Sequence, residues 1–144
     1  MNITYTNTLT AGQYSGLRKA VGWPVIEDTL AQKGLEHTAF LTVAEDGGKP
    51  VGMARVVSDY GAVILIVDVI VMPEYQGNGI GRELMTRVME YISQGTSPGQ
   101  SKMLNLMAAK GKDGFYEKFG FMARPNEKFG PGMTQWISKE AQSI

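Results

Sequence analysis

Hydrophobic and polar positions follow two different periods along the chain. Apolar residues recur at helical spacing in residues 10–21 and 25–35, and Gly22-Trp23-Pro24 separates the two stretches. Residues 37–44, 50–58 and 62–72 are instead typical of strands, and turns that contain glycine connect them. The pattern predicts two short helices followed by an antiparallel meander.

A third helical stretch follows the meander. From Gly79 to about Ile92 the apolar residues fall on one stripe of a helix, namely Ile80, Leu84, Met85, Val88 and Ile92. Downstream we expect a strand at 102–108, a short helix at 112–119, and strands at 121–124 and 133–137. These elements predict a single α+β domain over residues 1–144.

Composition removes several classes of function. The 144 residues include no cysteine, which excludes Cys-ligated metal sites and thiol nucleophiles, and we expect no metal. Lys plus Arg balance Asp plus Glu at 14 each without a basic run, so we expect neither nucleic-acid nor membrane binding. The N-terminus has no signal-peptide pattern and no stretch is long enough to span a bilayer, which predicts a cytoplasmic protein.

A glycine-rich turn joins the last strand of the meander to the following helix. The turn is Gln76-Gly77-Asn78-Gly79-Ile80-Gly81-Arg82, and its glycines allow backbone N–H groups and a helix N-terminus to face an anion. Arg82 occupies the sixth place where a dinucleotide fingerprint needs glycine, and neither Gly-Lys pair of the chain completes a Walker loop. A phosphate or pyrophosphate of another kind is therefore expected.

Two blocks resemble the GNAT N-acetyltransferases. The segment from Asp68 through Arg82 resembles their acetyl-coenzyme A signature, [QR]-x-x-G-x-[GA], and Phe115-Tyr116-Glu117-Lys118-Phe119-Gly120-Phe121 is similar to their C-terminal F-Y-E-K-x-G-F segment. The resemblance implies a GNAT-type fold, with a mixed, mostly antiparallel central sheet flanked by helices. It also implies acetyl-CoA as co-substrate, bound by the turn and by the preceding strand, that is, by Val69, Ile70, Val71, Gln76, Gly77, Asn78, Gly79, Ile80, Gly81 and Arg82.

The expected reaction is transfer of the acetyl group to a primary amine by direct attack. His37 is the only histidine and cysteine is absent, so a Ser-His or Cys-His acyl-enzyme has little support. The resemblance places Tyr116 where the family commonly protonates the coenzyme A thiolate. The alternative is that Tyr116 only packs a helix on the sheet. Lys110 stands where many relatives carry an Asn that helps to hold pantetheine.

Asp68 is the second predicted catalytic residue. It is the only charged residue in the apolar run that ends at Met72, so its carboxylate needs a partner or access to a cleft. It would take the proton of the amine or bind the ammonium. A structural carboxylate, tied to a backbone amide or to Arg55 across the sheet, is an equal alternative.

The acceptor side is predicted only in outline. The first two helices point to Tyr14, Arg18 and Trp23 as substrate contacts, although Trp23 also fits an anchor at the corner between the helices. We expect a small primary amine, such as a polyamine, arylalkylamine, amino sugar or amino acid, and we allow for a homodimer. A module that senses acetyl-CoA without turnover and a protein N-acetyltransferase stay open as alternatives.

Overall fold

The structure, a computed structural model, describes residues 1–140 in two compact units. The first unit runs from Met1 to Leu106 and the second begins at Met107. The single domain expected for residues 1–144 stays a prediction.

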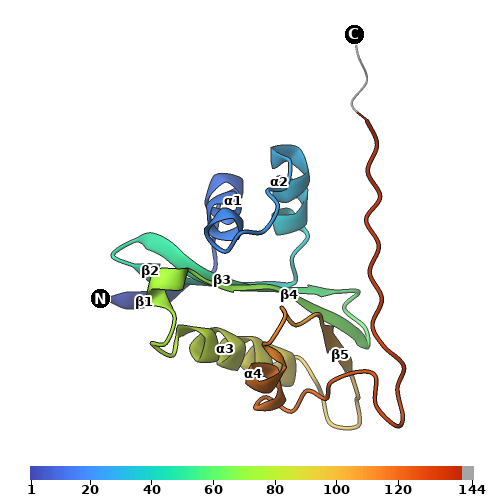
Figure 1. Cartoon of the computed structure of the whole chain (residues 1–144). Coiled ribbons are helices and arrows are strands. Elements are labelled where there is room, and N and C mark those ends of the chain that lie inside the picture. Colours follow the sequence, from blue (N-terminus) through green and yellow to red (C-terminus); the bar gives the residue numbers. More distant parts are fainter. Residues whose placement is uncertain (141–144) are drawn as a thin grey trace. The chain divides into compact units, whose positions relative to one another are not determined.

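The first unit contains a five-stranded sheet in the order β1-β2-β3-β4-β5 (Figure 1). The first four strands pair antiparallel, whereas β5 pairs parallel to β4, so the sheet is mixed and mostly antiparallel as predicted. The strands are β1 Ile3–Thr6, β2 Phe40–Asp46, β3 Lys49–Ser58, β4 Val63–Val71 and β5 Met103–Leu106.

Three helices of this unit cover the two faces of the sheet. Helices α1 (Ala11–Ala20) and α2 (Asp28–Glu36) lie on one face, and α3 (Ile80–Gln94) lies on the other (Figure 1). A capping box between Thr10 and Gln13 starts α1, and the Glu27 carboxylate accepts from two backbone N–H groups at the start of α2. All three helices agree with the predicted ranges to within a few residues.

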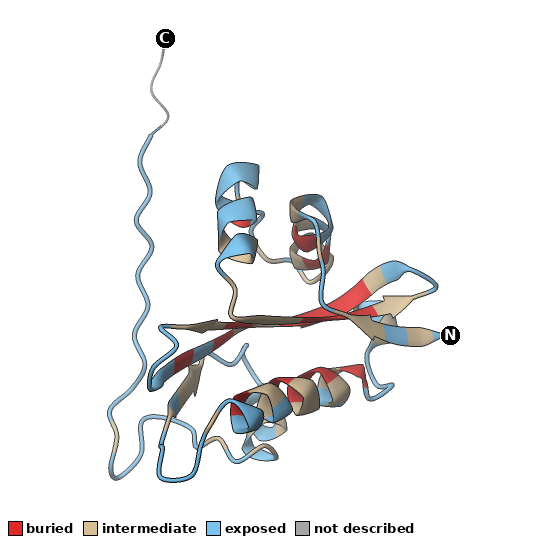
Figure 2. Cartoon of the chain, turned by 180° about the vertical axis from the view of Figure 1, so that it is seen from behind, coloured by how far each residue is buried: buried red, intermediate tan, exposed pale blue. Residues whose placement is uncertain are grey.

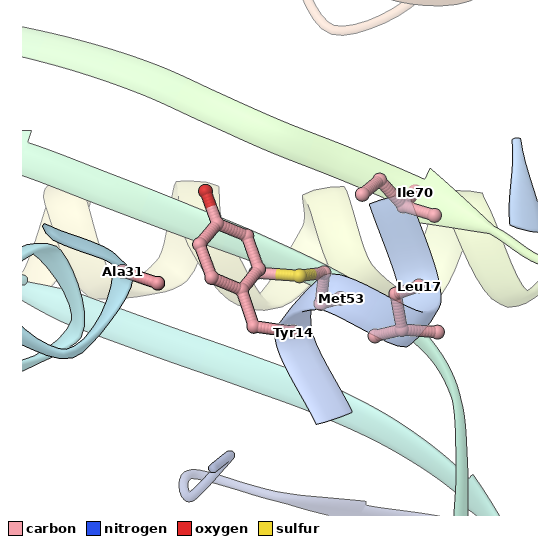
Figure 3. Packing of buried hydrophobic residues seen from close by; sticks show 5 residues of the cluster. All are labelled: Tyr14, Leu17, Ala31, Met53 and Ile70. Atoms are coloured by element: carbon pink, nitrogen blue, oxygen red, sulfur yellow. The ribbon is translucent and has the colours of Figure 1, made fainter. Parts of the chain in front are cut away.

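Both faces of the sheet are packed. On one face Tyr14, Leu17 and Ala31 from the helices meet Met53 and Ile70 from the sheet (Figure 3). On the other face α3 buries its apolar stripe, and the five residues predicted for it are the buried residues of that helix (Figure 2). Strand β3 lies in the middle of the sheet and is the most buried strand, because side chains cover it from both sides.

The first strand, β1, is not among the strands predicted from the sequence. β1 pairs antiparallel with β2 over Ile3–Thr6, where Ile3 and Tyr5 alternate with two threonines. That alternation is a strand signal, but four residues beside polar asparagines give a weak one. β1 is the edge strand of the sheet next to β2.

The second unit has less regular structure than predicted. Helix α4 spans Asp113–Glu117, inside the range expected for it. The strands expected at 121–124 and 133–137 are wrong, because these residues form no ladder. Residues 121–124 lead into a turn in which the Asn126 side chain accepts from the N–H groups of Lys128 and Phe129. Within the described chain, residues 133–137 make no backbone hydrogen bond.

Gly52 lets α3 approach the sheet at the end from which the glycine turn leaves. A Cβ at Gly52 would lie 2.9 Å from the Ile70 carbonyl oxygen and 3.3 Å from a methyl carbon of Leu84. The neighbours are backbone and core, so they cannot move away cheaply.

We therefore expect Gly52→Ala to lower the free energy of unfolding by about 1–3 kcal/mol. Gly16→Ala is the matched control, because no heavy atom lies within 4 Å of its Cβ position and helix α1 tolerates alanine. Urea denaturation followed by circular dichroism measures the free energy of unfolding of both variants. Equal stability of Gly52→Ala and wild type would show that the packing of α3 does not need glycine here.

Candidate active site

The glycine turn follows β4 through a short 3-10 helix, η1 (Pro73–Tyr75). Gly77 and Gly79 both adopt positive φ, at 79° and 80°, a conformation that favours glycine. Gly79 is the N-cap of α3 and supplies no side-chain cap. No heavy atom lies within 4 Å of the Cβ position of either glycine, so the turn is open on that side.

The backbone donors of the turn are unused. From Gly77 through Arg82, none of the six N–H groups donates to an acceptor within residues 1–140. The Asn78 side chain holds the turn from inside, because its amide donates to the carbonyls of Tyr75 at 3.0 Å and Gln76 at 3.2 Å. The first turn of α3 adds the positive end of a helix dipole. Free N–H groups at a helix N-terminus form an anion site.

A hydrogen bond anchors the turn to the opposite hairpin. The Tyr75 hydroxyl donates to the Asp46 carboxylate at 2.7 Å, and the backbone N–H of Asn2 donates to the other oxygen of Asp46 at 3.0 Å. The Asn2 N–H and then the Tyr75 hydroxyl lower the pKa of Asp46, so the carboxylate stays ionised at neutral pH. Sequence reasoning missed this pair, because nothing in the sequence links two residues that lie 29 positions apart.

The strand before the turn has an open edge. β5 pairs with β4 only from Val63 to Ile66, so residues 67–71 have no strand partner on that side within the described chain. Val69, Ile70 and Val71, the predicted contacts for the pantetheine arm, lie in this stretch. The Gln76 amide donates to the Val71 carbonyl at 3.0 Å and ties the turn to the strand. An extended ligand can pair with such an edge.

These features fit a ligand with a pyrophosphate and an extended amide-bearing arm. The turn offers N–H donors and open glycine positions for the phosphates, and Arg82 is exposed at the start of α3. The β4 edge ends at Val71, five residues before Gln76, and offers main-chain donors and acceptors for the arm. Coenzyme A has both parts.

β4 carries a bulge at Asp68. Met53 pairs with Ile70 and Arg55 pairs with Val67, so two residues, Asp68 and Val69, oppose Ala54 alone. Asp68 has φ of 53°, in the left-handed region. Because of the extra residue, side chains that follow the bulge point to the opposite face of the sheet from the one that the alternation before it predicts. Ile66 pairs with Val56 on the face covered by α3, whereas Ile70 packs on the face covered by α1 and α2.

The bulge places Asp68 among three donors. Its carboxylate accepts from the Tyr14 hydroxyl at 2.6 Å, from Nη1 of Arg18 at 2.9 Å and from Nε of Arg55 at 3.0 Å. The Asp68 side chain is 7% exposed, and the side chains of Arg18 and Arg55 are 16% and 14% exposed. The pairing with Arg55 is one that the sequence analysis named as the structural alternative.

The two arginines extend this cluster to the loops around it. Arg18 Nε donates to the Pro24 carbonyl at 2.8 Å, and Arg55 Nη1 donates to the Gly34 carbonyl at 3.2 Å. The Arg18 guanidinium also lies 5.5 Å from the centre of the Trp23 ring. The structure thus brings together Asp68 and the three residues predicted for the acceptor side, Tyr14, Arg18 and Trp23.

Tyr116 lies on α4 in the second unit. Its ring makes edge contacts with Phe115 at 5.0 Å and with Phe121 at 6.3 Å between centroids. Burial raises the pKa of its hydroxyl, so the group is protonated at neutral pH. No side chain within residues 1–140 hydrogen-bonds to that hydroxyl, which leaves it available to a ligand.

A family model of the acetyltransferase (GNAT) domain matches residues 37–123, more than half of the chain. The chain belongs to the GNAT acetyltransferase family. The matched range covers β2 to α4, and so includes the bulge, the turn and Tyr116. The chain is therefore an acyltransferase, and its α+β fold is the GNAT fold.

Solved structures and relatives similar to this chain carry acetyltransferase names, in agreement with the family model. A probable acetyltransferase from meticillin-resistant Staphylococcus aureus is 33% identical, with a TM-score of 0.85 over 94% of this chain and 100% of that chain. GCN5-related N-acetyltransferase 2, chloroplastic, of Arabidopsis thaliana is 36% identical over 76% of this chain and 49% of that protein. Serotonin N-acetyltransferase 2, chloroplastic, of Oryza sativa is 29% identical over 82% of this chain and 59% of that protein.

This GNAT chain spans only part of several relatives, from 49% to 71% of their lengths in the named proteins that it matches. No helix within residues 1–140 has the length and apolar character needed to cross a bilayer.

Asp68→Asn tests the cluster. The substitution replaces one acceptor oxygen by an N–H donor and removes the charge that neutralises two nearly buried guanidiniums. We expect the free energy of unfolding to fall by about 3 kcal/mol, as for a buried ion pair that loses one partner. Urea denaturation measures the loss.

Glu74→Gln is the control for Asp68→Asn, because Glu74 is exposed and makes no ion pair within the described residues. The free energy of unfolding of Glu74→Gln should be within about 0.5 kcal/mol of that of the wild type. If Asp68→Asn also left the free energy of unfolding unchanged, Asp68 would not stabilise the fold.

Proposed function

We propose that this GNAT protein transfers the acetyl group of acetyl-CoA to the primary amine of a small molecule. The observation that supports it best is the row of six unused N–H groups from Gly77 to Arg82, which adjoins the open edge of β4. In the proposed complex the turn from Gln76 to Arg82 binds the pyrophosphate. Val69, Ile70 and Val71 pair with the pantetheine arm through their backbone.

The proposed reaction is a direct displacement. The amine nitrogen forms a bond to the acetyl carbonyl carbon, the carbon–sulfur bond breaks, and the thiolate leaves with the electron pair. The amine loses one proton and the thiolate gains one. We assign delivery of that second proton to Tyr116, whose burial keeps its hydroxyl protonated at neutral pH. Water carries away the proton of the amine in this scheme.

Asp68 is better suited to positioning than to proton transfer. Three donors already engage its two oxygens, so an amine would have to displace one of them. We therefore favour a role in which Asp68 holds Tyr14 and Arg18 in place on the acceptor side. The direct catalytic role predicted for Asp68 stays a prediction that a kinetic comparison of Asp68→Asn can test.

The acceptor class rests on the relatives and on the fold. A rice relative carries the name serotonin N-acetyltransferase, and serotonin is an arylalkylamine. Trp23, stacked on Arg18, supplies an aromatic surface near the Asp68 cluster. Small amines of this class are our first candidates, and a protein acceptor is the alternative. The cytoplasmic location stays a prediction, since plant relatives are named as chloroplastic.

Binding of acetyl-CoA should stabilise the fold. At about 100 times the dissociation constant, mass action adds roughly 2.7 kcal/mol and raises the melting temperature by several degrees. Gly79→Asp places a carboxylate at the proposed pyrophosphate position and should abolish most of the shift in a thermal melt. NADH and ATP should give much smaller shifts with the wild type.

Gly99→Asp is the matched control, because Gly99 also has positive φ, at 86°, and an open Cβ position. Gly99→Asp carries the same backbone strain as Gly79→Asp, and acetyl-CoA should still raise its melting temperature by the full amount. A folded Gly79→Asp protein with an undiminished shift would refute the assignment of the turn.

The substitution Tyr116→Phe tests whether the protein turns acetyl-CoA over as an enzyme or only binds it as a sensor. The change removes one hydroxyl and keeps the ring contacts, so acetyl-CoA affinity should survive while the single-turnover rate falls on the order of 100-fold. The rate is measured by coenzyme A release with the best acceptor from a panel of amines. A rate equal to wild type would assign Tyr116 to packing, and a panel without any acceptor would favour the sensor.

A further inference from the structure

The Asp68 cluster carries more positive than negative charge. Arg18 and Arg55 both pair with the Asp68 carboxylate, and within residues 1–140 neither arginine pairs with a second carboxylate. Both side chains are mostly buried, so their surroundings screen the second guanidinium charge less than bulk water would. One positive charge of the cluster is therefore left without a counter-ion in the described chain.

Each arginine also keeps one free amino group. In Arg18, Nε donates to the Pro24 carbonyl and Nη1 donates to Asp68. In Arg55, Nε donates to Asp68 and Nη1 donates to Thr38 Oγ1 at 3.1 Å. Neither Nη2 group donates to an acceptor within residues 1–140, and neither is a fully buried atom without a partner, so solvent reaches both. Guanidinium groups with open donors suit a ligand with an oxyanion.

The cluster lies next to the place where the arm of acetyl-CoA would end. In the proposed complex the pyrophosphate lies at the glycine turn, and the arm runs back along β4 from Val71 to Val69. Asp68 directly precedes Val69, and its carboxylate is bonded to Arg18 of α1. The acceptor amine has to meet the thioester there. Trp23, whose ring centre lies 5.5 Å from the Arg18 guanidinium, adds an aromatic surface beside the cluster.

We propose that the acceptor carries an oxyanion, a carboxylate or a phosphate, near its amine, and that Arg18 and Arg55 bind this group through their Nη2 atoms. The bound oxyanion supplies the counter-ion that the cluster lacks. This inference rests on the proposed function and narrows its acceptor class. Among arylalkylamines, it selects those with an acidic group, and the aromatic ring of Trp23 favours an aromatic amino acid.

Matched pairs of acceptors test this inference. Tryptophan and tryptamine share a ring and an amine and differ by one carboxylate, and phosphoethanolamine and ethanolamine differ by one phosphate. With the wild type, kcat/KM for coenzyme A release should be higher for the anionic member of at least one pair, and that pair identifies the oxyanion. The uncharged member acetylated as fast or faster in both pairs would overturn the proposal.

Arginine variants connect this preference to the cluster. Arg18→Gln should reduce the preference for the anionic member on the order of 10–100-fold, because a hydrogen bond to a charged group is lost. The comparison of one pair between two proteins cancels the different basicities of the two amines. Arg87→Gln is the matched control, since Arg87 pairs with Glu83 on α3, on the other face of the sheet, and it should keep the preference.

Arg18→Lys and Arg55→Lys serve if Arg18→Gln does not fold. Lysine keeps a charge for Asp68 but has no forked donor group, so the preference should also fall in these variants. A folded Arg18 variant with the preference of the wild type would overturn the proposal.

Binding of the products separates this inference from the proposed function. If no amine were acetylated, the proposed function would fail, but titration calorimetry with the N-acetyl products of the same two pairs would still compare ligands with and without the oxyanion. The wild type should bind the anionic product of one pair about 10-fold more tightly or better, and Arg18→Gln should bind both members alike. Equal binding within both pairs, or no detectable binding of any product, would overturn the proposal.

Discussion

The buried charge of Asp68 is the constraint on which the first unit depends. A carboxylate within an apolar strand must be satisfied by donors, since water does not reach it freely. Here the donors come from α1 and β3, and the arginines that supply them also hold the α1–α2 loop and the end of α2. One ion cluster therefore fixes both N-terminal helices on the sheet. The net charge of the cluster, two guanidiniums against one carboxylate, is positive.

The bulge at Asp68 connects this cluster to the proposed binding of acetyl-CoA. Without the extra residue, Asp68 would share the face of Ile64 and Ile66 and would point into the core under α3. The bulge turns it to the other face, and Val69, the second residue of the bulge, lies within the open edge of β4. The same stretch of β4 thus carries a charged group on the proposed acceptor side and an unpaired edge on the proposed acyl-donor side.

The sequence predicted the parts of the fold that depend on local pattern. The stripe of α3 and the glycine turn could be predicted because helical spacing and positive-φ glycines are local properties. The partnership of Tyr14 and Arg18 with Asp68 could not, because it depends on a face reversal that periodicity does not encode. The strands predicted at 121–124 and 133–137 are wrong, because these residues form no ladder. A strand also needs a partner edge, and within residues 1–140 the segment at 133–137 has none.

The unused main-chain groups at the glycine turn and at the β4 edge differ in polarity, and they suit different parts of a ligand. The glycine turn exposes N–H groups alone at a helix N-terminus, which favours an anion. The β4 edge at Val69–Val71 exposes both donors and acceptors over a short length beside that turn, which suits the amides of a bound arm. The polarity of the free groups therefore distinguishes a position suited to phosphates from a position suited to an amide-bearing arm.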